Sequence, residues 1–200
     1  MLNSNTAEPL RITNPAAQKA LNDWFATLSE RYAGPEAGRI NGRARRAELK
    51  RMEPPYGVMM CEGYSALRQQ ITRSMTLQPV DEMALALFVS VAVHIKGNKP
   101  KLSFAAQLGE RLKGNRPCLN SLRFERLQKA SSPERFCQQL ISAVKIRGTE
   151  GVNVLSLADS IFLWMEEWLR RENDEPETSH PFTRNRIRWA NEYLSTSHIK

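Results

Sequence analysis

Apolar residues recur at every third or fourth position through most of the chain, which is the repeat of an amphipathic α-helix. The repeat is plain in residues 58–75, where four side chains share one face: Tyr64, Leu67, Ile71 and Met75. A strand would need alternating apolar and polar residues bounded by turn dipeptides, and the sequence contains no such run. The pattern therefore predicts an all-α protein.

Start and stop signals divide this pattern into separate helices. Asn14-Pro15 supplies a capping side chain followed by proline at the first helical position, and Ser132-Pro133 repeats the signal later in the chain. Gly148 is the expected end of the helix that begins at Ser132. The predicted helices cover residues 15–32, 43–52, 58–75, 79–96, 103–113, 119–130, 133–147, 154–171 and 182–194.

The loop at residues 96–101, with the sequence KGNKPK, is the best candidate for an internal boundary. It divides an N-terminal helical half, residues 1–95, from a C-terminal helical half, residues 96–200. The acidic stretch at residues 172–177 is predicted to be a surface loop between the last two helices.

Targeting and membrane signals are not found in the sequence. The longest uncharged apolar run, residues 83–95, has 13 residues, whereas a membrane-spanning helix needs about 18 or more. We therefore expect a buried helix there and no membrane partner. The first residues lack the pattern of a signal peptide. The three widely spaced cysteines, Cys61, Cys118 and Cys137, are predicted to be buried thiols of a reducing cytoplasm.

Positive charge is concentrated in two blocks. The chain has 29 Lys and Arg residues against 21 Asp and Glu residues, a net charge of +8. Residues 39–51 contain six basic residues and one acidic residue, and residues 96–147 contain twelve basic and three acidic residues. Each of the other segments is slightly acidic. The sequence therefore predicts a localised basic surface, for which a polyanion is the first partner to consider.

Within each block the cations follow one face of a predicted helix. The first stripe is Arg43, Arg46 and Lys50, and the second is Arg123, Arg126 and Lys129. The acidic residues that normally accompany cations on a solvated helix are nearly missing. Like charges so close together cost some stability, which a phosphate backbone would offset. Nucleic-acid binding is therefore the predicted function of these stripes.

The predicted nucleic-acid-binding residues are cations of these blocks and one arginine nearer the C-terminus: Arg43, Arg46, Lys50, Arg51, Lys99, Lys101, Lys113, Arg116, Arg123, Arg126, Lys129 and Arg184. No zinc finger, RNA-recognition motif or clear helix-turn-helix signature accompanies them, which favours contacts to the backbone over base reading. Two alternatives stay open. They are a free-standing helical DNA-binding regulator and a protein scaffold whose cations pair with acidic partners.

A catalytic, metal or cofactor site is not predicted. The sequence has no Gly-rich phosphate loop, HExxH or GxSxG motif. The histidines, His94, His180 and His198, lie far apart, and His94 is expected to be a partly buried side chain on an apolar helix. The pairs Asp81-Glu82 and Glu166-Glu167 are adjacent in sequence, so on a helix their side chains diverge by about 100°. We expect no enzyme activity, cofactor or metal.

Four stretches resemble the CasB family, the small subunit of the type I-E CRISPR complex Cascade. They are Ala47–Met52 (AELKRM), Leu102–Leu108 (LSFAAQL), Leu122–Leu127 (LRFERL) with the following Ser132-Pro133-Glu134, and Arg184–Tyr193. In the last stretch Arg186, Trp189 and Tyr193 are similar to an R-x-x-W-x-x-x-Y pattern that also contains Arg188. The order and spacing of the four stretches over residues 40–194 make the resemblance specific.

The resemblance implies an all-α protein of roughly nine helices in two small bundles, without catalytic activity. It implies a second copy packed head to tail, contacts with the backbone and large subunits of Cascade, and contacts with crRNA and with target and non-target DNA. Carried over by position, Arg51, Arg123 and Lys129 match the family's nucleic-acid face, with Lys50 and Arg126 as supporting members. The first 38 residues, Gly148–Asn153 and residues 172–177 look longer than is usual in the family.

Overall fold

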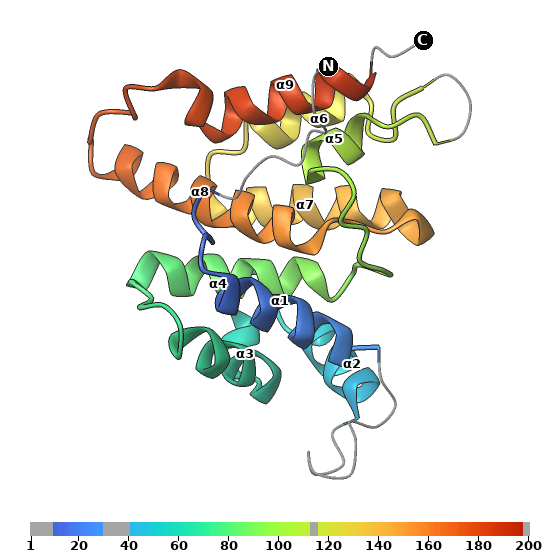
Figure 1. Cartoon of the computed structure of the whole chain (residues 1–200), viewed down its shortest axis with the longest axis vertical. Coiled ribbons are helices and arrows are strands. Elements are labelled where there is room, and N and C mark those ends of the chain that lie inside the picture. Colours follow the sequence, from blue (N-terminus) through green and yellow to red (C-terminus); the bar gives the residue numbers. More distant parts are fainter. Residues whose placement is uncertain (1–9, 30–40, 113–115, 198–200) are drawn as a thin grey trace.

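The structure, a computed structural model, describes residues 10–29, 41–112 and 116–197 (Figure 1). In these residues the regular structure consists of nine α-helices and three short 3₁₀ helices. Asn98 and Val152 form an isolated bridge, and no strand is present within the described ranges. The predicted all-α class is confirmed.

The helices lie close to their predicted positions. They are α1 (Pro15–Thr27), α2 (Gly42–Arg51), α3 (Glu62–Thr72), α4 (Pro79–Ala92), α5 (Phe104–Gly109), α6 (Ser121–Gln128), α7 (Pro133–Arg147), α8 (Val154–Glu172) and α9 (Asn185–Ser197). The 3₁₀ helices are η1 (Gly57–Met60), η2 (Gly148–Glu150) and η3 (Pro181–Thr183). The predicted caps Asn14 and Ser132 each accept a backbone N–H of the first turn. The helix predicted over residues 103–113 ends earlier, at Gly109, because the backbone of Glu110 is extended.

Helix α4 lies at the centre of the molecule (Figure 1). Every residue from Ala84 to Ala92 is buried, as an all-apolar helix requires. It packs against α7 and α8 of the C-terminal half and against α2 and α3 of the N-terminal half. Residues 1–95 and 96–200 therefore share one core, and their division into two bundles stays a prediction. Within the described ranges, none of the helices combines the length and apolar character that a membrane span requires.

Helices α5 and α9 pack at close range. A Cβ atom at Gly109 would lie 2.3 Å from Thr196 Oγ1 and 2.4 Å from the carbonyl oxygen of Tyr193, so this position needs glycine. Trp189 of α9 is buried and packs edge-on against Phe104 of α5, with ring centroids 5.6 Å apart. Helix α5 is short, so its position depends on aromatic packing against α9.

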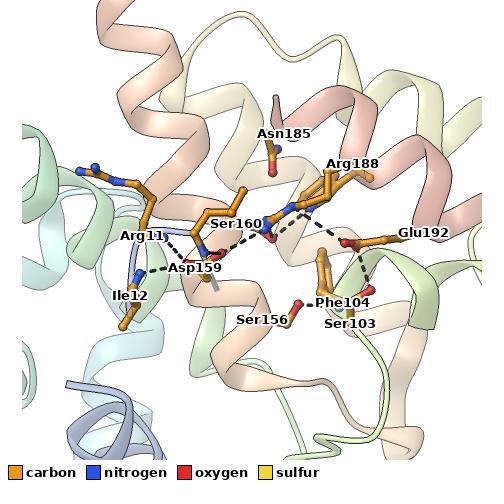
Figure 2. Close-up of polar contacts among 12 residues, drawn as sticks. Arg11, Ile12, Ser103, Phe104, Ser156, Asp159, Ser160, Asn185, Arg188 and Glu192 are labelled. Carbon is orange, nitrogen blue, oxygen red and sulfur yellow. Dashed lines mark hydrogen bonds and ion pairs between the residues drawn. The ribbon is translucent and has the colours of Figure 1, made fainter. Parts of the chain in front are cut away.

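A buried charge network joins the N-terminal segment to α8 and α9 (Figure 2). The carboxylate of Asp159, whose residue is 2% exposed, accepts the backbone N–H groups of Arg11 at 2.7 Å and Ile12 at 2.9 Å. The Arg188 guanidinium pairs with Asp159 at 3.1 Å and also donates to Ser160 Oγ. Glu192, one turn further along α9, accepts a hydrogen bond from Ser103. Within the R-x-x-W-x-x-x-Y stretch, Arg188 therefore joins α9 to α8, and Trp189 packs α9 against α5.

The three cysteines are free thiols. Cys61 and Cys137 are buried as predicted, whereas Cys118 is only half-buried. Burial raises the pKa of Cys137 to about 12. A thiol that stays protonated in this way is a poor nucleophile, in keeping with a structural role.

Candidate nucleic-acid interface

The second predicted stripe, named here the α6 stripe (Arg123, Arg126 and Lys129), lies on the outer side of α6 and at its C-terminal end. All three side chains are exposed, because Phe124 and Leu127 take the buried side of the helix. Asn120 caps the helix by accepting the N–H of Arg123 at 2.9 Å. The cap and the apolar side together present the cations to solvent.

The ion pair of Lys129 with Glu125 was not expected. Its Nζ lies 2.6 Å from Glu125 Oε1, one helical turn earlier. The hydrogen bond from Lys129 and its charge lower the pKa of Glu125. Both side chains are more than half exposed, and an exposed pair of this kind contributes little stability. Lys129 can therefore exchange Glu125 for a phosphate, but Arg123 and Arg126 are the stronger members of the stripe.

The α6 stripe lies beside the outer face of α7. Arg123 and Arg126 line a shallow hollow of about 310 Å³, together with Gln139, Ser142 and Ile146 of α7. These α7 residues are polar or exposed, and no carboxylate is among the described residues that line the hollow. Figure 1 shows α6 and α7 as neighbours behind α9 and α8. A polyanion that reaches the stripe would therefore also meet the surface of α7.

A second group of positive charges gathers where α2, the end of α4 and α7 meet. We name it the basic cluster and define it as Arg46, Lys50, His94, Lys96 and Lys145. Arg46 Nη2 donates to the carbonyl oxygen of Ile95 at 2.9 Å, and its guanidinium lies 5.6 Å from the centroid of the Phe25 ring. These contacts fix α2 against the end of α4. Burial lowers the pKa of Arg46.

Charges within the basic cluster lower the pKa of two of its members, Lys50 and His94. The pKa of Lys50 is lowered by partial burial first and then by the charges of Arg46, Lys145 and Lys96. Burial and the charges of Lys145, Lys50 and Arg46 lower the pKa of His94 to about 4. The neighbouring cations thus make Lys50 and His94 harder to protonate. An anion bound among them would relieve that repulsion.

Three members of the basic cluster were not among the predicted binding residues. Lys96 and Lys145 belong to the long basic block, which was the available signal, but neither follows a predicted stripe. His94 was expected to be a partly buried side chain, and it is half-buried. No local pattern indicates that it faces Lys145, because the two residues lie on different helices.

The other predicted residues differ in their surroundings. Arg43, Arg51, Lys101 and Arg116 are exposed, as is Lys99, whose backbone is fixed by hydrogen bonds with Val152 and Gln107. Lys113 lies outside the described residues. Arg184 is engaged within its own loop, since its guanidinium donates to the carbonyl oxygen of Thr178 and pairs with Glu177 at 2.5 Å. Arg184 lines a cavity of about 940 Å³ that Lys129 of the α6 stripe also lines.

The acidic pairs singled out in the sequence have structural partners. Asp81 accepts the N–H of Gln78 in a capping box at the start of α4. Glu166 pairs with Arg11 and Arg170, each at 2.9 Å. Glu167 accepts the N–H of Asn185, and burial raises its pKa. Within the part of the chain that the structure describes, no group of three or more side chains is arranged to hold a metal ion.

Aromatic packing on α9 positions the α6 stripe. Tyr193 stacks on Phe124 with centroids 4.0 Å apart and ring planes 10° apart, and its hydroxyl donates to the carbonyl oxygen of Leu119 at 2.7 Å. Tyr193 of the R-x-x-W-x-x-x-Y stretch therefore supports α6 from its buried side. None of its buried aromatic rings is available for base stacking.

The fold and this surface define a small all-α protein whose cations face solvent on and around α2, α6 and α7. In a comparison with protein families, residues 45–194 match the family described as CRISPR-associated protein Cse2. The chain belongs to this family, which is the CasB small subunit of type I-E Cascade. All four stretches that carried the resemblance lie within the matched range. Comparison with curated proteins and with solved structures found no match.

Proposed function

We propose that this protein is a non-catalytic, nucleic-acid-binding subunit of its Cascade complex. The α6 stripe and the exposed cations of α2 would hold the region of the crRNA–target heteroduplex and the displaced non-target strand. The observation that carries the proposal is the exposure of Arg123 and Arg126 beside a hollow on α7 that no carboxylate of the described chain lines. Cations so placed neutralise phosphates and release counterions.

Contacts to the phosphate backbone of the nucleic-acid strands suit such a role. Opening a DNA duplex and forming the RNA–DNA duplex is a nearly balanced exchange, so protein contacts to the strands can tip it. Base pairing with the guide already reads the sequence, and the α6 stripe needs only to bind phosphate. Binding of phosphates by Arg and Lys side chains, whatever the base sequence, is therefore sufficient to prolong the lifetime of the open R-loop.

Its partners in the proposed complex are crRNA, both DNA strands, the backbone and large subunits, and a second copy of the chain. These partners rest on the family, as does a cytoplasmic place of action. The absence of catalysis is supported by the carboxylates of Asp81, Glu166 and Glu167, each of which is occupied by a cap, an ion pair or a backbone N–H.

The test uses the assembled complex with Arg123→Ala/Arg126→Ala in this subunit. We expect normal assembly and a shorter lifetime of the open R-loop, measured by the chemical reactivity of unpaired thymines in the displaced strand. A matched control, Lys19→Ala/Arg73→Ala, removes two exposed cations from α1 and the end of α3. Equal lifetimes for the two double variants and the wild type would refute the proposal. A strong preference for one DNA sequence by the free protein would favour the regulator instead.

A further inference from the structure

The cavity of about 940 Å³ lies where the second half of α8, the start of α9 and the connection from α6 to α7 meet. Pockets that hold small ligands have volumes of about 300–1,000 Å³, so its size suits such a ligand. Phe136, Trp164 and Trp189 form an apolar wall. Phe136 stacks on Trp164 with ring centroids 4.1 Å apart and lies 6.0 Å from the centroid of Trp189. The contacts proposed for Arg123 and Arg126 leave this cavity without a function.

Three hydrogen-bond acceptors line the cavity. Asn185, at the start of α9 (Figure 2), is 2% exposed, and its Oδ1 has no hydrogen-bond partner among the described residues. The hydroxyl oxygen of Thr178 is also buried without such a partner. Glu167 Oε1 accepts the backbone N–H of Asn185 at 2.8 Å, which fixes these two residues side by side. Buried acceptors without donors lower stability, so this arrangement favours a ligand that brings N–H groups.

The arginines around these acceptors oppose a ligand that is itself a cation. Arg170 and Arg171 line the cavity, and the Arg171 guanidinium lies 5.8 Å from the centroid of the Trp164 ring. Arg184 donates to the carbonyl oxygen of Thr178. A lysine or arginine side chain of a partner protein would be repelled by all three. A neutral planar group with amino N–H donors avoids this repulsion, and its flat face can stack on a guanidinium such as that of Arg171.

The rim of the cavity has cations that suit a phosphate. Lys129 and Arg186 are exposed and both line the cavity. Both lower the pKa of Glu125, Lys129 by a hydrogen bond and its charge and Arg186 by its charge, so the two cations lie near the same carboxylate. Gln128 Nε2 donates to the carbonyl oxygen of Arg186 at 3.0 Å, which joins the end of α6 to the start of α9. The glutamates of residues 172–177 that also line the cavity would repel a phosphate, which leaves it to Lys129 and Arg186.

We propose that this cavity binds a nucleobase that carries an exocyclic amino group, with the phosphate of its nucleotide at Lys129 and Arg186. Adenine, cytosine and guanine have such a group, whereas thymine and uracil do not. Asn185 would accept the amino N–H, as asparagine does when it binds adenine. The inference rests on the proposed function for one source of the base, a strand held by the α6 stripe. A free mononucleotide, the other source, has the same chemistry.

The expected preference for an amino base is modest. One hydrogen bond to the amino group corresponds to about three- to tenfold in affinity. Sequence-specific proteins discriminate between sites and other DNA by about a thousandfold or more. Phosphate contacts therefore still supply most of the affinity for a strand, and the cavity adds a preference for base type.

The first experiment follows the binding of two mononucleotides to the full chain by NMR. They are dAMP and purine 2′-deoxyriboside 5′-monophosphate, which lacks only the amino group. We expect dAMP to bind about three- to tenfold more tightly. Asn185→Leu, which replaces the amide by an apolar group of similar size, should abolish this difference. Gln70→Leu makes the same change at an exposed site of α3 and should keep it.

Two further measurements protect the test against a variant that misfolds. In the wild type, dAMP should shift the indole N–H resonance of Trp164 and leave that of Trp24, which donates to the carbonyl oxygen of Gly63, unchanged. Lys129→Gln/Arg186→Gln should weaken both mononucleotides equally, because it removes contacts to the phosphate alone. Asn185→Leu should not lower the urea midpoint, since Asn185 Oδ1 forms no hydrogen bond within the described chain.

A second experiment identifies the source of the base. It compares oligothymidylate with one central deoxyadenosine and the same strand with purine 2′-deoxyriboside at that position, by fluorescence anisotropy. Tighter binding of the deoxyadenosine strand, lost in Asn185→Leu, assigns the cavity to a base of a bound strand. Equal binding of the two strands, with a preference for dAMP among the mononucleotides, assigns it to a free nucleotide.

The outcomes separate this inference from the proposed function. Absence of an amino preference in both experiments, or a preference that persists in folded Asn185→Leu, overturns the inference. The proposed function then still stands if Arg123→Ala/Arg126→Ala weakens strand binding. A preference for dAMP without any binding of strands overturns the proposed function alone. A shift of the Trp164 resonance by N-acetylarginine amide but not by dAMP would assign the cavity to a basic protein side chain and overturn the inference as well.

Discussion

Tyr193 of α9 and Phe124 of α6 stack face to face, with ring centroids 4.0 Å apart. The Tyr193 hydroxyl also donates to the carbonyl oxygen of Leu119, just before α6 begins. One side chain thus contacts both the start and the middle of the helix that carries Arg123 and Arg126. The interface is exposed, but its position depends on buried aromatic contacts.

Replacing Tyr193 by Phe should separate these two contributions. The ring stack survives, whereas the buried Leu119 carbonyl loses its donor, which costs about 1–3 kcal/mol of unfolding free energy. We expect a lower midpoint of urea unfolding and unchanged binding of single-stranded DNA. Loss of binding in a folded Tyr193→Phe protein would mean that the hydroxyl contributes to the interface directly.

Arg123→Ala/Arg126→Ala should weaken binding by the isolated protein without unfolding it. Substitutions at such exposed positions usually change stability by no more than about 0.5 kcal/mol. The loss of two phosphate contacts should lower the magnitude of the log–log salt slope on single strands by about 1.4. Lys129→Ala should have a smaller effect, because Lys129 must first leave Glu125. An unchanged slope and affinity in the double variant would exclude α6 as the binding helix.

Gly109→Ala should be strongly destabilising. The new methyl group would meet Thr196 Oγ1 and the Tyr193 carbonyl oxygen well inside contact distance, and overpacking of this kind costs about 1–3 kcal/mol. Gly97→Ala is the control, since no atom lies within 4 Å of its Cβ position. Urea unfolding of the two variants provides the comparison. Similar stabilities would show that α5 and α9 can move apart at little cost.

The neutral state of His94 should make stability depend on pH. The pKa of His94 is about 4 in the fold and near 6.5 in the unfolded chain, so the unfolded chain binds the proton more tightly. The stabilising effect of keeping His94 neutral is complete above pH 6.5 and declines as pH falls toward about 4. His94→Gln should remove this decline, whereas His180→Gln should retain it. Urea midpoints measured against pH give the test, and parallel curves for His94→Gln and the wild type would contradict it.

Incubation of the purified protein with labelled DNA or RNA and Mg²⁺ should leave both intact. The physical reason is that Glu166 and Glu167 are already occupied by Arg11, Arg170 and the Asn185 N–H. Gel electrophoresis of the substrates gives the readout, with Glu166→Gln/Glu167→Gln as the comparison variant. If the wild type cleaves the nucleic acid and this variant does not, the protein is a nuclease that uses these carboxylates.

Several local features were predictable because they depend on residues close together in sequence. Asn14 and Ser132 cap their helices as predicted, since a cap needs only a side-chain oxygen and the N–H two or three residues later. The pairing of Lys129 with Glu125 follows the same local rule of one helical turn, and the sequence contained that signal. The end of α5 at Gly109 was harder to foresee, because contact with α9 rather than helix propensity accounts for this glycine.

By itself the sequence determined the all-α class, most of the helices and the two blocks of positive charge, because periodicity, capping and composition are local properties. Only the tertiary structure decided which cations act together. Lys50 and Lys145 act on His94 because α2, α4 and α7 converge, whereas Arg184 is engaged by Glu177 and the Thr178 carbonyl oxygen. Charge–charge interaction and burial depend on distance in space, and no local repeat encodes the distance between residues on different helices.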